Sequence, residues 1–100
     1  MTQLHNRARG EVLLDVDGAP HRLCVTLGAL AELEAAFDVA SFQDLGARVG
    51  ALSASDLIVV VAALTTGSDA PLSAAQVASA NVDPRAAAEA VAEAFRLAFE

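Results

Sequence analysis

The first third of the chain changes from an alternating pattern of apolar and polar residues to a helical one. Val12, Leu14 and Val16 alternate with acidic or other residues, as in a strand with one buried face. Asp17-Gly18 then marks a turn, because glycine adopts positive φ without strain and aspartate tolerates it better than most residues. The segment therefore predicts a first strand followed by a tight turn.

The return strand contains Leu23 and Val25. A two-residue loop at Asp17-Gly18 and a four-residue loop over residues 17–20 both place these two side chains on the apolar face of the first strand. Pro20 has no N–H to donate, so we expect it outside the paired part of the hairpin. The pattern predicts a β-hairpin over residues 11–25, with the loop length left open.

A helical spacing begins directly after this hairpin. Leu27, Leu30 and Phe37 recur at helical intervals, and Thr26 is placed to cap the first turn. Leu30 and Leu33 lie in the apolar stripe of this helix. We therefore expect both to be core residues that pack on the apolar face of the hairpin.

Helix start signals recur along the rest of the chain. Ser41, Ser53 and Ser73 each precede an Asp or Gln by three residues, and Asp83-Pro84 is a typical helix opening. The run from Ile58 to Val61 alone fits a buried strand, but the cap before it and the alanines after it favour a helix. Helices are predicted at residues 27–37, 42–49, 54–66, 73–80 and 84–99.

These elements predict an α+β fold, in which an N-terminal β-hairpin is followed by a compact bundle of four to five helices. A chain of 100 residues is long enough for one modest core. We expect a flexible N-terminal tail over residues 1–9 and a single domain over residues 10–100.

Composition excludes several classes of partner. Thirteen acidic residues stand against six basic ones, for a net charge of −7, so neither a phosphate-binding surface nor nucleic acid binding is expected. The longest apolar run, Leu57 to Leu64, is far shorter than the roughly 20 residues of a membrane span, so no membrane association is expected. A single cysteine, Cys24, and the absence of a leader in the first ten residues indicate the cytoplasm.

The chain offers few groups for chemistry. His5 and His21 have no second ligand or carboxylate at a spacing that metal binding favours, and Cys24 reads as a small side chain of a strand. Asp15 and Asp17 fit a solvated strand edge better than a cation site, because a calcium loop needs a longer run of oxygen ligands. We therefore predict no catalytic, cofactor-binding or metal-binding residues, no cofactor, and no enzyme activity.

The last predicted helix has a distinct apolar stripe, made of Ala88, Val91, Phe95 and either Ala98 or Phe99. Its opposite face is charged and is expected in water. Both phenylalanines fit a core, but Phe99 sits one residue from the end of the sequence, where complete burial is difficult. Phe99 is therefore the best single candidate for a contact with a partner.

The apolar segment Leu57 to Leu64 has the same ambiguity. It is apolar on every face, so it forms either the central buried helix or, in part, the wall of a groove for another chain. The residues predicted to bind a partner are Leu57, Val61, Leu64, Phe95 and Phe99.

Several segments resemble the small tail-assembly chaperones encoded in phage-like gene transfer agents. The resemblance is carried by Gly10-Glu11-Val12, by Asp17-Gly18, by Arg22-Leu23 and above all by the run Thr26 to Glu34. A second anchor is the run Leu52 to Leu57, and the likeness covers nearly the whole chain more weakly.

The resemblance implies a chaperone that binds the tape-measure protein transiently during tail morphogenesis and keeps its long helices from aggregating. The tail tube protein is a further implied partner. Two alternatives stay open: a structural, tube-associated component of the particle, and a small adaptor or regulatory protein. Tube subunits are typically β-sandwiches, so a chain with one hairpin and several helices favours the chaperone. The formation of homo-oligomers is left open.

Overall fold

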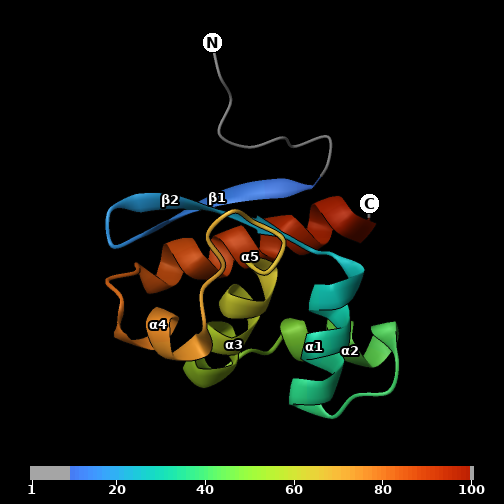
Figure 1. The fold of residues 1–100 in the computed structure, drawn as a ribbon. Helices are drawn as coiled ribbons and strands as arrows, with labels where there is room; N and C mark the ends of the chain where they lie inside the picture. Colours follow the sequence, from blue (N-terminus) through green and yellow to red (C-terminus); the bar gives the residue numbers. More distant parts are fainter. Residues whose placement is uncertain (1–9, 100) are drawn as a thin grey trace.

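The computed structural model describes residues 10–99, so the tail predicted for residues 1–9 lies outside the described part. Within it, the chain forms an N-terminal two-stranded hairpin followed by five helices, which confirms the predicted α+β fold (Figure 1). The elements are β1 (Glu11–Val16), β2 (Ala19–Cys24), α1 (Leu27–Phe37), α2 (Phe42–Val49), α3 (Ala54–Leu64), α4 (Ala74–Ser79) and α5 (Pro84–Phe99).

The hairpin closes with the two-residue turn Asp17-Gly18. Val16 pairs with Ala19 beside the turn, so of the two loop lengths left open by the sequence the shorter one forms. Both turn residues have positive φ, 55° at Asp17 and 80° at Gly18. Two successive positive φ angles give the turn whose twist matches that of the flanking strands, which explains why Asp-Gly occupies it.

The expectation that Pro20 lies outside the paired strands is wrong. Pro20 belongs to β2 and is paired with Asp15. In an antiparallel pair, hydrogen-bonded and non-hydrogen-bonded positions alternate, and a two-residue turn closes on a hydrogen-bonded pair, here Val16 and Ala19. Pro20 therefore falls at a non-hydrogen-bonded position, where its missing N–H removes no bond of the ladder.

The helices begin at the caps that the sequence indicates. The Thr26 side chain accepts a hydrogen bond from the Ala29 backbone N–H at 3.0 Å and so caps α1. Ser53 and Ser73 form complete capping boxes at the starts of α3 and α4, with the side chain of the residue three positions on returning the bond. Ser41 caps α2 by accepting from the Asp44 N–H. These local bonds explain why the observed helix starts match the predicted ones closely.

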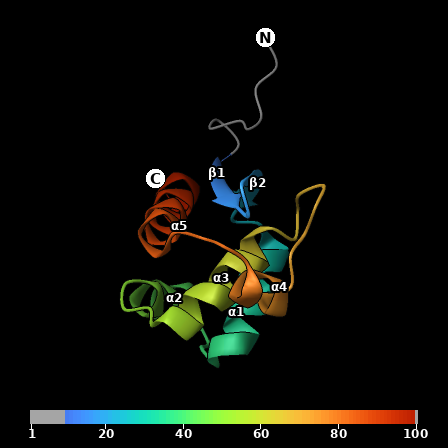
Figure 2. The same ribbon diagram turned by 90° about the vertical axis from the view of Figure 1, so that its left-hand side faces the viewer.

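Helix α3 is the centre of the molecule. The hairpin and α5 lie side by side along one side of α3, while α1, α2 and α4 surround its other sides (Figures 1 and 2). Val60, Val61 and Leu64 of α3 are at most 1 % exposed, so the run that resembles a buried strand is a buried helix. A helix that is apolar all round is stable only when neighbours cover most of it.

One continuous core joins these elements. Leu14 and Leu23 from the hairpin belong to the same buried cluster as Leu30 and Leu33 from α1, which confirms that the two α1 leucines are core residues. The main neighbours of α1 are α3 and α2 and not the hairpin, so the expectation that α1 packs on the hairpin face is wrong: α3 lies between them as the central helix. Leu27 does not take part: although it fits the helical spacing, its side chain is 80 % exposed. Its place in the first turn of α1 leaves it on the outer side of the helix.

The predicted apolar stripe of α5 needs a correction. The buried residues of α5 are Ala87, Ala90, Val91 and Ala94, whereas Ala88 is exposed. The helix is therefore turned relative to the prediction, so that its alanine-rich side faces the hairpin and α3. Small side chains let a helix axis approach its neighbours closely, and the larger Phe95 and Phe99 side chains lie outside this buried set, Phe95 partly buried and Phe99 exposed.

Candidate functional site

The five residues predicted to bind a partner fall on two separate surfaces and in the core. Leu64 is fully buried, at 0 % exposure, and Val61 is 1 % exposed. Leu57 is partly buried and lies with Val61 beside an apolar groove on one side of α3. Phe95 and Phe99 lie beside a different groove. Of the five residues, only Leu57, Phe95 and Phe99 reach the molecular surface, whereas Val61 and Leu64 are buried.

The first surface is the α3–α4 groove, which has a volume of about 200 Å³. Its walls come from α3, α4 and the start of α5, and they are formed by Leu57, Ile58, Val61, Val77 and Ala87 among others. All residues of this lining are apolar. Val61 and Val77 belong to this lining although both are buried, so they contribute to the inner side of the groove.

The second surface is the α2–α5 groove, which has a volume of about 410 Å³. It is lined by Gln43, Leu45, Gly46, Val49, Phe95 and Phe99. The two phenylalanine rings stack with centroids 6.1 Å apart and an angle of 23° between their planes. Phe99 is 58 % exposed, which is unusual for a large aromatic side chain and places an apolar ring at the molecular surface.

An ion pair holds the α2 wall of this groove in place. The guanidinium of Arg48, at the end of α2, donates from Nη2 to both carboxylate oxygens of Asp56, at 3.0 and 3.1 Å, and from Nε to Oδ2 at 3.1 Å. The same guanidinium lies 4.6 Å from the centroid of the Phe37 ring, at the end of α1. Arg48 thereby fixes α2 against the end of α1 and the start of α3.

The contacts with Arg48 and Ser53 lower the pKa of the Asp56 carboxyl. Desolvation raises the pKa of its carboxyl, but the hydrogen bond from Arg48, the backbone N–H of Ser53 and the charge of Arg48 together outweigh it. The pKa is therefore held below its ordinary value of 3.8. Asp56 also closes the capping box of α3, so one carboxylate links the helix start to α2.

A polar cleft lies at the other end of the molecule, between the hairpin and the loop that follows α3. Arg22 and Asp69 form an ion pair of 2.7 Å across it, and His21 lies on the same wall. The loop is held by the buried hydroxyl of Thr65, which donates to the Ala62 carbonyl and accepts from the Leu72 N–H at 2.8 Å. These polar contacts hold the loop against the hairpin, and the cleft lies between the two.

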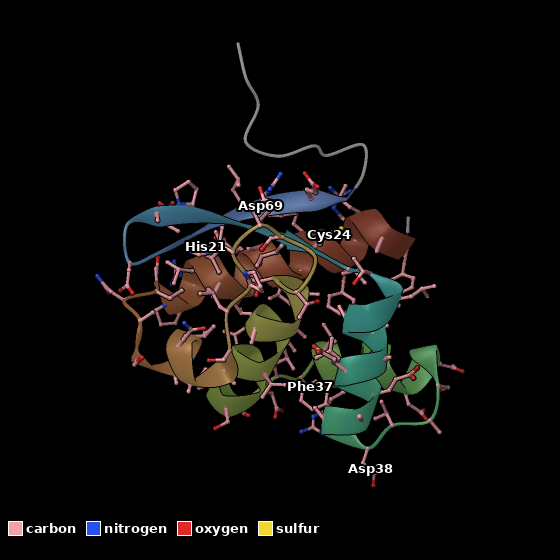
Figure 3. The ribbon with its side chains drawn as sticks, in the orientation of Figure 1. His21, Cys24, Phe37, Asp38 and Asp69 are labelled. Atoms are coloured by element: carbon pink, nitrogen blue, oxygen red, sulfur yellow. The ribbon has the colours of Figure 1, made fainter. Side chains whose placement is uncertain are left out.

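Within the part of the chain that the structure describes, the titratable side chains are spread over several elements. Figure 3 shows His21 and Cys24 on the hairpin, well away from Phe37 and Asp38 at the end of α1. Asp17 accepts a hydrogen bond from the Asn81 N–H at 2.7 Å, so its carboxylate is already engaged inside the fold. Among residues 10–99, no cluster of three or more His, Cys, Asp or Glu side chains could hold a metal ion. His5 lies outside the described residues.

Sequence reasoning missed the contribution of α2. Its lining residues Leu45, Gly46 and Val49 come from a short helix that was predicted at residues 42–49 but was given no part in partner binding. The available signal was Gly46, a glycine in a helix interior, where it weakens the helix. Across the described part of the chain, no helix is both long and apolar enough to span a bilayer.

One of the comparisons with known proteins gives a match, and this match covers nearly the whole chain. Residues 9–100 match the sequence model of a protein family described as "Phage tail tube protein, GTA-gp10". Neither a curated protein nor a solved structure shows a significant match. Because the match includes the hairpin and all five described helices, the chain belongs to the phage tail tube protein family GTA-gp10.

Proposed function

We propose that this protein is a tube-associated component of a phage-like tail and acts by binding other tail proteins. The observation that carries the proposal is the family match over residues 9–100, because the family is described as a tail tube protein and is not an enzyme family. The same description speaks against a free-standing regulatory adaptor. We place this binding in the cytoplasm, as the single cysteine leads us to expect.

A second role within tail assembly is that of a chaperone for the tape-measure protein. It is favoured by the architecture of residues 10–99, where one two-stranded hairpin accompanies five helices. A tube wall built from β-sheets needs more strands than this hairpin supplies, whereas apolar grooves between helices suit the capture of a partner helix. The protein would then leave the tail before it is complete.

Both roles need a surface for a protein partner, and we propose that Phe95 and Phe99 in the α2–α5 groove, or Leu57 in the α3–α4 groove, contribute to it. Exposed aromatic rings beside a groove are typical anchors of protein interfaces. The net charge of −7 keeps such an apolar surface from causing self-aggregation, because the copies repel one another.

Mass spectrometry of purified particles separates the two roles. Recovery of this chain in a fixed ratio to the tail tube subunits would support the tube-associated component. Its absence from particles, together with failed tail formation when the gene is deleted, would support the chaperone. Normal tails without the gene, and particles that lack the protein, would contradict both roles.

The variant Phe99→Glu tests the surface. A charge at this exposed position should leave the fold intact but weaken binding to tape-measure or tube protein, because it places a carboxylate against an apolar contact. Leu27→Glu is the matched control, since Leu27 is also exposed but lies outside both grooves. If both variants bind like the parent, the α3–α4 groove with Leu57 becomes the surface to test.

A further inference from the structure

Gly46 occupies the interior of α2 although the fold gives no reason for a glycine there. Its backbone does not have the positive φ that favours glycine, and a Cβ at this position would meet no atom within 4 Å. A glycine in a helix interior destabilises the helix relative to alanine. The eight-residue helix α2 therefore carries a destabilising residue for which neither backbone conformation nor internal packing accounts.

The bare backbone of Gly46 faces the α2–α5 groove, opposite the stacked rings of Phe95 and Phe99. Helices α2 and α5 are held by different neighbours, α2 by α1 and α5 by the hairpin and α3, which leaves the space between them open. Without a side chain at Gly46, another polypeptide backbone can approach α2 closely. The groove thus combines aromatic anchors on one wall with unoccupied space on the other.

The apolar surface continues along α5 beyond the groove. Ala88 and Ala92 are exposed and lie at helical intervals from Phe95 and Phe99, so the four residues share one face. From Ala88 to Phe99 this face extends about 16 Å at the rise of an α-helix. That length corresponds to about three turns of a second helix lying alongside α5.

The net charge of the chain determines which kind of partner this surface attracts. The cations Arg48 and Arg96 are engaged by Asp56 and Glu93. Helices α2 and α5 together carry three carboxylates, Asp44, Glu89 and Glu93, and three guanidinium groups, Arg48, Arg85 and Arg96, so the charge that a partner meets is set by the net charge of −7 of the whole chain. A second copy of the chain would bring the same negative charge to the contact, whereas a basic partner would be attracted.

We infer that the α2–α5 groove binds an amphipathic helix of another protein, with apolar residues on one face and lysine or arginine residues flanking them. The inference rests on the proposed function, in that the helix belongs to a tail protein. Apolar side chains of this helix pack between Phe95, Phe99 and Val49, its backbone passes over Gly46, and its basic residues are attracted by the net negative charge of the chain.

Two variants of α2 test the inference without changing the charge. Gly46→Leu fills the groove where the structure has free space, and Ala47→Leu places the same side chain at the next, exposed position of the helix, outside the groove lining. The probes are two synthetic amphipathic helices of roughly 18 residues, one built from Leu and Lys and the other from Leu and Glu, with binding followed by isothermal titration calorimetry. Circular dichroism checks that both variants are folded.

We expect the parent and Ala47→Leu to bind the Leu/Lys helix with similar affinity, Gly46→Leu to bind it at least about tenfold more weakly, and the Leu/Glu helix to bind poorly to all three. Equal binding of the Leu/Lys helix by Gly46→Leu and the parent would overturn the inference, because attraction by net charge alone does not depend on Gly46. A parent dimer in analytical ultracentrifugation that Gly46→Leu dissociates would also overturn it and assign the groove to a second copy.

Tail formation in cells that carry each variant distinguishes failure of the inference from failure of the proposed function. If the gene is needed for tails and Gly46→Leu restores them as well as the parent does, the protein acts in the tail but not through this groove. If deletion of the gene leaves tails normal, the proposed function itself is wrong. Failure of Gly46→Leu to restore tails, with restoration by Ala47→Leu, supports both.

Discussion

At the scale of single residues, Asp17 joins two distant parts of the chain. Its φ of 55° forms the first half of the hairpin turn. Its backbone N–H donates to the Asn81 carbonyl at 3.0 Å, and its Oδ1 accepts from the Asn81 N–H at 2.7 Å. One residue thereby fixes the hairpin tip to the segment between α4 and α5.

Replacing Asp17 should separate these contributions. Asp17→Ala loses the side-chain bond to Asn81 and places a residue that disfavours positive φ in the turn, so we expect a loss of about 2 to 3 kcal/mol in the free energy of unfolding. Asp17→Asn keeps an acceptor oxygen and tolerates the conformation, so its stability should be close to that of the parent. Urea denaturation followed by circular dichroism measures both, and equal stability of Asp17→Ala and the parent would show that the Asn81 contact contributes nothing.

Leu30 and Leu27 offer a second comparison within one helix. Leu30 is 6 % exposed in the core, whereas Leu27, three residues earlier, is 80 % exposed. Leu30→Ala should lower the free energy of unfolding by about 2 to 5 kcal/mol, because it leaves a cavity among packed side chains. Leu27→Ala should change it by less than about 0.5 kcal/mol. Chemical denaturation midpoints that do not differ between the two variants would contradict the burial of Leu30.

At the scale of elements, the helices are held together by a few polar contacts in addition to the core. The contact of Arg48 with Asp56 and with the Phe37 ring connects α2, α3 and α1 at one point. Asp56 also caps α3, so loss of its charge affects both the contact between helices and the start of a helix. The short helix α2 depends on this contact more than the longer helices do, since an isolated helix of its length is unstable.

This arrangement predicts a pH dependence of stability with a definite sign. The pKa of Asp56 is lower in the folded protein than its ordinary value of 3.8, so the folded state binds the proton less readily than the unfolded state. The contribution of Asp56 is therefore fully present above about pH 4 to 5 and is lost as the pH falls through the lowered pKa of the folded protein. The stability difference between the parent and Asp56→Asn should be greatest at neutral pH and should shrink below about pH 4.

The control for this prediction is Arg48→Met. Removing the guanidinium takes away the hydrogen bonds and the charge that lower the pKa of Asp56, so the variant should lose much of the pH dependence that Asp56 contributes. Urea denaturation at several pH values measures these differences. A stability difference between Asp56→Asn and the parent that stays constant down to pH 3 would show that the ion pair does not lower this pKa.

At the scale of the whole molecule, the hairpin, α3 and α5 share a single buried cluster. Elements that complete one core gain little from folding separately, so we predict that residues 10–100 form one domain and unfold in a single transition. The chain has no Trp or Tyr, so differential scanning calorimetry is the suitable measurement. The calorimetric enthalpy should equal the van't Hoff enthalpy, and Val91→Ala in α5 should lower the midpoint of the whole transition. A second transition would show that the helices unfold independently of the hairpin.

The elements themselves could be predicted from the sequence because each has a local cause. Alternating apolar residues and Asp17-Gly18 specify the hairpin, and the caps at Thr26, Ser53 and Ser73 specify where helices start. The predicted ends of the helices were less accurate. Helix α3 ends at Leu64 and not at residue 66, and its C-cap Thr65 is not a glycine in the αL conformation, so the sequence had no clear signal for this end. Capping and turn chemistry act over a few residues, so a single sequence contains them completely.

The surfaces, in contrast, were decided by tertiary packing. The sequence indicated Phe95 and Phe99 but placed the apolar stripe of α5 around Ala88, which is exposed. In a helix so rich in alanine, the two adjacent stripes through Ala87 and through Ala88 are both apolar, so the stripe that is buried depends on how the helix packs on the hairpin and α3. The α2–α5 groove likewise requires two helices that are more than thirty residues apart in the chain and are held by different neighbours. Local pattern determined the secondary structure and the fold class, while the fit between elements distant in the sequence decided which side chains reach the surface and where a partner can bind.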